Sequence, residues 1–474
     1  MNKNVPSRYS IIRKLTSLDS HINVNKKSAA VSHPSNMKEV KEKVHGTFYV
    51  VFISLLLDLL AFTMILPLLP SLLDHYREND TTGLYSWLSR QVYFFQKMVG
   101  APDKFNSVLF GGFLGSMFSF LQFVTSPIIG GISDVVGRKI VMLVCMVGIS
   151  LSYVLWALSN NLVLFILARI LGGISKGNVS ISMAIITDVS TINTRGKGMA
   201  LVGIAFSLGF IVGPMIGAIF AVWAKQKTGN WFVVPALFAL MLSIADVIYF
   251  AIFFKESLPK EKRAKHFAAT LDHAKTLINV KDLFQFTAVK NIKSQDLKEL
   301  RRLGLIYFVY LFIYSGLEFT LTFLTHHVFN YTSMQQGWMF FAIGLTMAII
   351  QGAFVRRVPP HKTRSTGILG LWIIIPSFIS VGLATGPLLL YFGLFLYAVS
   401  TAMVVPSITT LASQHGTEQQ KGTVMGIFRS LGALARALGP IVASIAFWGV
   451  GSKITYLIGS IFLFWPVLAL KDKV

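Results

Sequence analysis

Long apolar runs are the feature that most constrains how this chain can fold. Stretches of about 20 apolar residues, the length that spans roughly 30 Å of hydrocarbon as a helix, recur along the 474 residues. Their approximate limits are 47–70, 106–129, 140–159, 163–187, 198–222, 231–254, 304–328, 335–355, 367–385, 387–408, 423–448 and 452–470. Because a helix satisfies its own backbone hydrogen bonds, the pattern predicts an all-α integral membrane protein with twelve transmembrane helices.

The charges are few and unevenly distributed. Only 13% of residues are charged, yet the net charge is +23. Nucleic-acid binding would need that charge on a folded face, but most of the Lys and Arg residues lie in residues 1–46, in the loops on the same side and in the tail 471–474. This positive-inside pattern predicts that both termini are cytosolic and that no nucleic acid is bound. Residues 1–46 lack the apolar core of a signal peptide, so we expect a disordered cytosolic tail.

A basic stretch between the sixth and seventh runs divides the chain. It predicts a cytosolic linker at 255–303 between six-helix bundles at 47–254 and 304–470. RGKGMALVGIAFSLGFIVGPMIGA (195–218) aligns without a gap with KGTVMGIFRSLGALARALGPIVAS (421–444). Because the matching segments hold the same ordinal position in each half, we expect two bundles related by a pseudo-twofold axis, with a substrate between them near the midplane.

Three motifs point to a known family. GGISDVVGRK, Gly130 to Lys139, combines glycines that permit a tight turn with Asp134 and Arg138, which can form an ion pair. It resembles the cytoplasmic loop signature of the major facilitator superfamily. Arg169 with Gly173 and Gly177 resembles a second family pattern.

The third motif, Gly209, Gly213, Pro214 and Gly217, resembles the pattern of the antiporter branch. Small residues at this spacing let helices pack closely, and Pro214 predicts a kink. The first two runs are similar to bacterial tetracycline exporters of the drug:proton antiporter group, and later stretches resemble animal tetracycline transporter-like proteins. The resemblance implies a secondary active transporter that moves small amphipathic organic ions, above all organic anions including drugs, by alternating access coupled to protons.

Charged residues inside apolar runs are costly, at roughly 2.5–3.5 kcal/mol each on insertion scales, so they mark function. Asp58, Lys176, Glu318 and Arg436 lie deepest in their runs. We expect Asp58 and Glu318 to carry protons. The substrate-binding candidates, several of them placed at the cavity by the resemblance, are Lys176, Arg169, Gln122, Arg436, Phe62, Tyr314 and Tyr397. The cytoplasmic gate is expected at Gly130, Asp134, Gly137, Arg138, Lys139 and Arg429.

Each charge also has a structural interpretation, in which it neutralises a neighbour and holds the bundle together. The two interpretations of Arg169 are equally favoured, and packing is favoured for Asp246. Asp188 and Arg195 are expected to shape the loop that joins the fourth and fifth runs. Whether Lys176 pairs with a ligand or with Asp58 stays open at this stage.

Other classes of function are less well supported. No hydrolase or kinase motif is present, so an enzyme is not expected. His326 and His327 should face different directions without a third ligand, so neither a metal nor a cofactor is expected. A facilitative uniporter and a non-transporting receptor or scaffold on the same fold remain alternatives. We expect a monomer in the lipid bilayer, with the plasma membrane, the nuclear envelope and endolysosomal membranes all open, and with the use of the sequons at Asn79 and Asn330 undecided.

Overall fold

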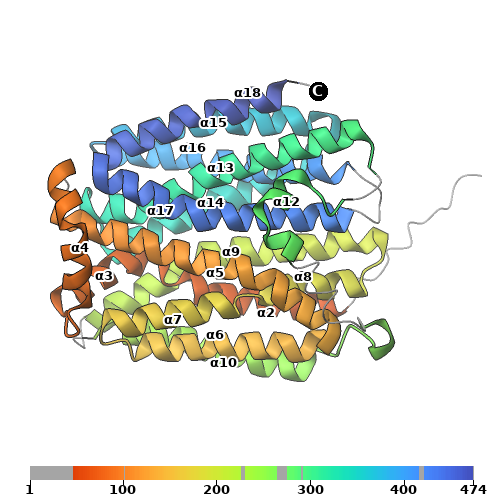
Figure 1. The fold of residues 1–474 in the computed structure, drawn as a ribbon, viewed down its shortest axis with the longest axis horizontal. Coiled ribbons are helices and arrows are strands. Elements are labelled where there is room, and N and C mark those ends of the chain that lie inside the picture. The colour runs from red at the N-terminus through yellow and green to blue at the C-terminus, as the bar shows by residue number, and fades with distance from the viewer. Residues whose placement is uncertain are drawn as a thin grey trace, which may run out of the picture. The chain divides into compact units, whose positions relative to one another are not determined.

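A computed structural model describes residues 46–100, 102–225, 230–263, 275–289, 292–415 and 421–472. The regular elements of these residues are helices (Figure 1). Eleven of them are long and apolar enough to cross a membrane. The predicted N-terminal tail lies outside the described residues except for Gly46, which begins the first helix.

The first half of the chain runs to Phe253. Its elements are α2 (Gly46–Thr63), η1 (Leu66–Leu68), α3 (Leu69–Glu78), α4 (Leu84–Val99), η2 (Asp103–Phe105), α5 (Asn106–Val136), α6 (Arg138–Ala157), α7 (Leu162–Ser175), α8 (Asn178–Val189), α9 (Ile192–Lys225) and α10 (Val233–Phe253). The sequence did not predict α4, which crosses the ends of the long helices in Figure 1. Its side chains Trp87, Phe94 and Met98 are exposed, which suits a helix that lies in a membrane interface.

The second half follows a short connecting region. The elements are η3 (Lys260–Lys262), α12 (Val280–Gln285), α13 (Ser294–His327), α14 (Ser333–Ala353), η4 (Val355–Arg357), η5 (Pro360–Lys362), α15 (Thr363–Leu383), α16 (Pro387–Ser413), α17 (Lys421–Phe462) and α18 (Phe464–Lys471). Helix α13 begins inside the stretch predicted as a linker. The segment SQDLKEL, which precedes the apolar run 304–328, is helical and continuous with it.

The described residues form eleven candidate spans where the sequence predicts twelve, and the difference lies at the end of the chain. Residues Thr423–Lys471 form the last of the eleven candidate spans. Within α17, however, Gly451 has φ 82° and ψ 165°, a conformation that interrupts a helix and that favours glycine. This break lies between the last two apolar runs of the sequence.

Equivalent glycines of the internal repeat make equivalent contacts. A Cβ atom added at Gly213 of α9 would lie 1.9 Å from Thr63 Oγ1 of α2. One added at Gly439 of α17 would lie 2.5 Å from Ser315 Oγ of α13. In each half, therefore, the helix with the Gly-Pro pair packs closely on the first helix of that half.

The same two helices also contact the other half. A Cβ atom at Gly337 of α14 would lie 3.4 Å from the Pro214 carbonyl oxygen, and one at Gly112 of α5 would lie 3.0 Å from the Pro440 carbonyl oxygen. Beside Pro440, the Ile441 amide donates a hydrogen bond of 2.9 Å to Ser116 Oγ of α5. The contacts of α9 with α14 and of α17 with α5 thus join the halves.

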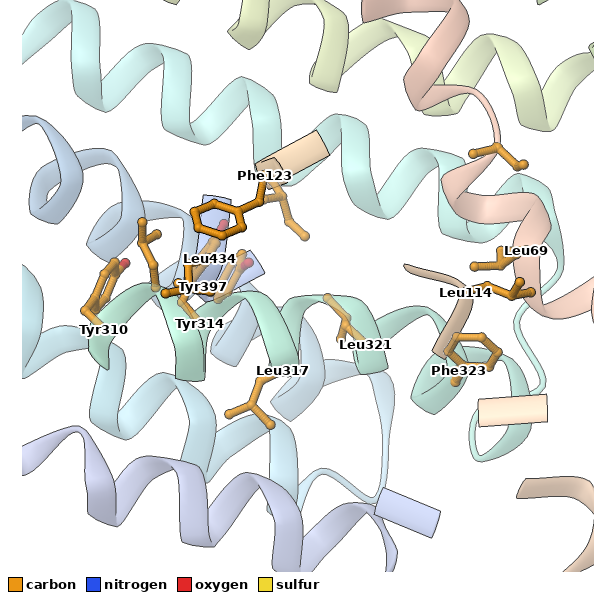
Figure 2. Packing of buried hydrophobic residues seen from close by; sticks show 14 of the residues in the cluster. Leu69, Leu114, Phe123, Tyr310, Tyr314, Leu317, Leu321, Phe323, Tyr397 and Leu434 are labelled. Carbon is orange, nitrogen blue, oxygen red and sulfur yellow. The ribbon is translucent and has the colours of Figure 1, made fainter. Parts of the chain in front are cut away.

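Buried apolar side chains close one end of the molecule between the halves. Figure 2 shows Leu69 of α3, Leu114 of α5 and Phe323 of α13 near one another. A Cβ atom at Gly111 of α5 would lie 2.3 Å from the Phe323 ring, so this contact is tight. We call this the α3 end; the Gly130–Lys139 loop, at the far ends of α5 and α6, lies at the opposite end (Figure 1).

Candidate functional site

A buried ion pair joins α2 to the α7–α8 segment. Lys176 Nζ donates to both carboxylate oxygens of Asp58 at 2.8 Å. Each side chain is only 4% exposed. The sequence left open whether Lys176 pairs with a ligand or with Asp58, and in this conformation it pairs with Asp58.

Lys176 lies where the fourth apolar run breaks. Helix α7 ends at Ser175, Lys176 has φ −76° and ψ 20°, and α8 starts at Asn178. Asn178 is the first residue of α8, and its side chain accepts a hydrogen bond from the Val179 amide at 2.9 Å. The apolar run predicted at 163–187 corresponds to one candidate span, Leu162–Val189, which this local break divides into two helices. Interrupted helices line the substrate and ion sites of many transporters.

An aromatic pair lies under the two cations. The rings of Phe62 and Phe118 stack with centroids 5.3 Å apart. Lys176 Nζ lies 4.7 Å from the centroid of Phe62, and Arg169 Cζ lies 4.8 Å from that of Phe118. Arg169 has no ion-pair partner among the described residues, so cation–π contacts take the place of a neutralising carboxylate. A small cavity of about 10 Å³ adjoins this stack and is lined by Phe62, Trp156 and Arg169 among others.

Asp246 of α10, for which the sequence analysis favoured a packing role, lies within electrostatic reach of the ion pair. It is 3% exposed, and the charges of Asp58 and Lys176 act on it. Its Oδ1 atom and the nearby Ser54 Oγ are buried without a hydrogen-bond partner among the described residues. A buried carboxylate oxygen without a hydrogen-bond partner makes the charged form of the side chain costly.

A second cluster lies on α13 and α16. Tyr314 Oη donates a hydrogen bond of 2.9 Å to Glu318 Oε1. The Tyr314 ring stacks on Tyr397 at 5.1 Å, with the planes 8° apart. Arg436 of α17 is exposed, although it is far from the ends of its helix, and its charge acts on Glu318. In Figure 2, Phe123 of α5 points toward Leu434 and the two tyrosines.

The predicted substrate-binding residues therefore fall into two groups. The group around Asp58 includes Lys176, Arg169 and Phe62, and the group around Glu318 includes Tyr314, Tyr397 and Arg436. No hydrogen bond or ion pair between described residues joins the groups. Gln122 of α5 is half-buried and has no hydrogen bond to the described part of the chain.

The loop between α5 and α6 contains the expected ion pair. Arg138 contacts Asp134 at 2.7 Å, and its Nε atom donates to Asp188 of α8 at 2.9 Å. Glu256 accepts hydrogen bonds from the Arg138 and Lys139 backbone amides at 3.0 and 3.2 Å. Asp188, expected to shape a different loop, thus also anchors this one, whereas the Arg195 side chain lies outside the described residues.

Two residues of the predicted gate do not show the role expected of them in this conformation. Gly130 lies inside α5 with open space around it, and only Gly137, at φ 117°, forms the turn. The glycine at 130 therefore does not provide the turn that was expected of it. Arg429 of α17 forms no hydrogen bond or ion pair with the loop, all of whose residues are described, so this conformation does not connect them.

The antiporter-type glycines pack α9 against α2. Added Cβ atoms would lie 2.6 Å from Leu59 Cβ at Gly209 and 2.2 Å from the Met64 carbonyl oxygen at Gly217. Thr63 Oγ1 also donates a hydrogen bond of 2.8 Å to the Gly209 carbonyl. This close packing was predicted. Helix α9 is continuous through Pro214, and the kink expected there stays a prediction.

The histidine pair at the end of α13 has a partner that the sequence analysis did not identify. His326 Nε2 lies 2.8 Å from Asp74 Oδ2 of α3, so a third group with ligand chemistry is present. Asp74 is far from the pair in the sequence, and a motif search along the chain gives no signal for it.

Comparison with known proteins places these features in a family. The model of the family described as Major Facilitator Superfamily matches residues 51–440. Mouse major facilitator superfamily domain-containing protein 10 is 45% identical, over 89% of this chain and 91% of its own length. The crystal structure of the human organic anion transporter MFSD10 (TETRAN) has a TM-score of 0.75 and 43% identity, and the match covers 90% of this chain and 98% of the solved one. Tetracycline resistance protein, class B, of Escherichia coli is 23% identical over 83% of this chain and 86% of its own length.

Proposed function

The chain belongs to the major facilitator superfamily, and from that premise we propose that it is a proton-coupled transporter of small organic anions. Membership makes it a multi-pass membrane transporter and sets it apart from enzymes. The observation that carries the finer proposal is the buried Asp58–Lys176 pair at the break between α7 and α8. The human relative MFSD10 is an organic anion transporter, which supports the substrate class.

The pair supports a specific coupling. Lys176 is buried, so it needs a negative partner, and Asp58 supplies one in this conformation. A substrate carboxylate that binds Lys176 displaces Asp58, and the released carboxylate then favours a proton because it is buried and unpaired. Anion and proton therefore bind in the same state and move in the same direction. The antiporter-type motif on α9 suggests the opposite, namely that the proton and the substrate exclude each other.

The aromatic surroundings suit an amphipathic substrate. Phe62 and Phe118 offer apolar faces beside two cations, and ligand sites combine mostly apolar walls with a few charged groups. The adjoining cavity of about 10 Å³ is far smaller than the roughly 300 Å³ of a small-ligand pocket, so this site must open before it binds. Alternating access provides that opening, with the α3 end closed in the present conformation.

We also propose the finer architecture: twelve spans in two bundles of residues 47–254 and 304–470, with cytosolic termini. The break at Gly451 supports counting Thr423–Lys471 as two spans. The matching contacts of Gly213 and Gly439 support two related bundles. The only cysteine, Cys145, is buried, so single-cysteine labelling at Asn79→Cys and Glu261→Cys tests the topology. Labelling from opposite sides is expected, and labelling from one side refutes it.

Transport in liposomes is the decisive experiment. The purified full chain is reconstituted with an imposed pH gradient, and uptake is measured for an aryl carboxylate, its methyl ester and an aryl amine of equal size. We expect the carboxylate alone to accumulate, and faster when its own side is acidic. Accumulation driven by the opposite gradient would show antiport. Flux without any response to pH would show a facilitative uniporter, and binding without flux would show a receptor.

Matched lysine variants test the role of Lys176. Lys176→Gln is expected to weaken binding of the carboxylate roughly tenfold, the value of one charge-assisted hydrogen bond, and to leave binding of the ester unchanged. Lys225→Gln is the control, because Lys225 also lies over an aromatic ring, 4.7 Å from Trp231, but at the end of α9. An equal loss for carboxylate and ester would assign Lys176 a structural role.

A further inference from the structure

Two histidines and an aspartate meet at the α3 end of the molecule. Asp74 is on α3, and His326 and His327 are the last two residues of α13. Their ligand atoms all lie within 4.8 Å of one another, and the two imidazole rings are 4.9 Å apart at 72°. The adjacent histidines thus differ in direction, as expected, yet one ligand atom of each lies within 4.8 Å of Asp74, so small side-chain rotations bring all three groups to one ion.

The donor set suits a zinc ion. Two imidazoles and one carboxylate, with a water as fourth ligand, form a frequent Zn²⁺ site with bonds of about 2.0–2.2 Å. His326 Nε2 already lies 2.8 Å from Asp74 Oδ2, and Oδ1 of the same carboxylate has no hydrogen-bond partner among the described residues. The side chains of Asp74 and His326 are 20% and 22% exposed, so an ion can reach them.

Neighbouring groups hold the second histidine in place. Ser107 Oγ of α5 shares a hydrogen bond of 2.8 Å with His327 Nε2. The Phe323 ring stacks on the His327 ring with centroids 6.2 Å apart, and the Phe105 ring meets the His327 ring edge-on, also at 6.2 Å. Outer partners of this kind orient metal-binding imidazoles and raise their affinity.

The cluster connects the two halves of the chain. Asp74 and Ser107 belong to the first half, and both histidines belong to the second. The apolar contact of Phe323 with Gly111 closes the same end, and it lies next to the cluster because the Phe323 ring stacks on His327. An ion held by groups from both halves would stabilise the closed conformation of this end.

We propose that Asp74, His326 and His327 form a Zn²⁺ site whose occupation holds the α3 end closed. The binding part of this inference stands on the three side chains alone. The consequence, slower transport when zinc is bound, rests on the proposed function, because alternating access requires this end to open.

Zinc binding to the purified full chain tests the site without any substrate. We expect one Zn²⁺ per chain by isothermal titration and an increased unfolding temperature with zinc. Asp74→Asn, His326→Gln and His327→Gln each remove a direct ligand, so each should weaken binding by more than the roughly 10–100-fold that loss of an outer partner of a metal ligand typically costs. His75→Gln is the matched control, because His75 is adjacent to Asp74 but packs against Phe232, 5.3 Å away. Zinc affinity that is unchanged in all three variants, or lost equally in the control, overturns the site.

A variant that removes the positive charge beside Asp74 gives a second test of the zinc site. Arg77 Nη1 lies 3.5 Å from Asp74 Oδ1 and repels an incoming cation. Arg77→Gln should therefore tighten zinc binding, which a merely structural cluster does not predict. Each variant is first checked for an unfolding temperature close to that of the parent without metal. Weaker zinc binding in Arg77→Gln contradicts the proposed position of the ion.

Transport measurements then test the closure. Zinc added on the side of the α3 end should slow carboxylate exchange in the parent protein and leave His326→Gln unaffected. Zinc that binds but leaves exchange unchanged overturns the closure. A chain that transports none of the substrates would contradict the proposed function, while the titrations would still decide the zinc site.

Discussion

Lys176 Nζ lies 2.8 Å from each carboxylate oxygen of Asp58, and both side chains are almost completely buried. Asp58 lies on α2 and Lys176 lies at the break between α7 and α8. Because both side chains are buried, water cannot replace the partner of either charge. Removal of one member of a buried pair typically costs about 3–5 kcal/mol, because the other is left as an uncompensated charge.

The first prediction concerns the stability of this pair. Asp58→Asn and Lys176→Met should each lower the unfolding temperature, whereas the double variant should recover most of the loss, because no lone charge remains. Thermal unfolding in detergent measures all three against the parent. Losses that simply add in the double variant would mean that the two residues are not coupled.

Removal of the charge at Asp246 should have the opposite effect on stability from removal of the charge at Asp58. Its Oδ1 atom is buried without a hydrogen-bond partner among the described residues, so its negative charge is not stabilised as that of Asp58 is. Asp246→Asn should leave the unfolding temperature at or above that of the parent, while it changes the pH dependence of carboxylate uptake. A fall in stability as large as that of Asp58→Asn would contradict this prediction.

The Tyr314–Glu318 hydrogen bond gives a third prediction. Glu318→Gln keeps an acceptor for Tyr314 Oη, so the fold should persist while the response of transport to pH weakens. Tyr314→Phe removes the donor and should also change the pH profile of transport. Tyr310→Phe is the control, because the Tyr310 hydroxyl is buried without a partner among the described residues and its ring stacks on Tyr314 at 5.6 Å. Equal effects of both tyrosine variants would indicate lost packing.

Local patterns in the sequence predicted local features of the structure well. The apolar runs gave the helices, the Asp134–Arg138 spacing gave an ion pair, and the α9 glycines gave close packing. Each of these depends on residues within one or two helical turns, or on the backbone freedom of a single residue type.

Features that depend on which helix faces which were not predictable in the same way. The partner of Lys176 stayed open because the sequence does not state how α2 is oriented relative to the α7–α8 segment. Asp246 was assigned to packing because its distance from Asp58 in space was unknown. Asp74 was missed as a partner of His326 because 252 residues separate them. Polar contacts between distant helices therefore require the three-dimensional structure.

The α5–α6 loop provides a fourth prediction. Arg138 bonds both Asp134, whose side chain is 44% exposed, and Asp188, whose side chain is 16% exposed. Exposed ion pairs contribute about 0–1 kcal/mol, and shielded hydrogen-bonded ones contribute more. Asp188→Asn should therefore lower the unfolding temperature more than Asp134→Asn does. The reverse order would show that the bond to α8 does not anchor the loop.

The last prediction separates the two kinds of glycine that the motifs contain. A Cβ atom at Gly217 would lie 2.2 Å from the Met64 backbone oxygen, which cannot move without displacing α2, whereas Gly130 has nothing within 4 Å. Overpacking of this kind typically costs about 1–3 kcal/mol, and alanine in an open helical position stabilises by up to about 1 kcal/mol. Gly217→Ala should thus lower the unfolding temperature and reduce transport, while Gly130→Ala should leave stability equal or slightly higher. If Gly130→Ala abolishes transport in a stably folded protein, Gly130 has a role in another conformation, where the space beside it is filled.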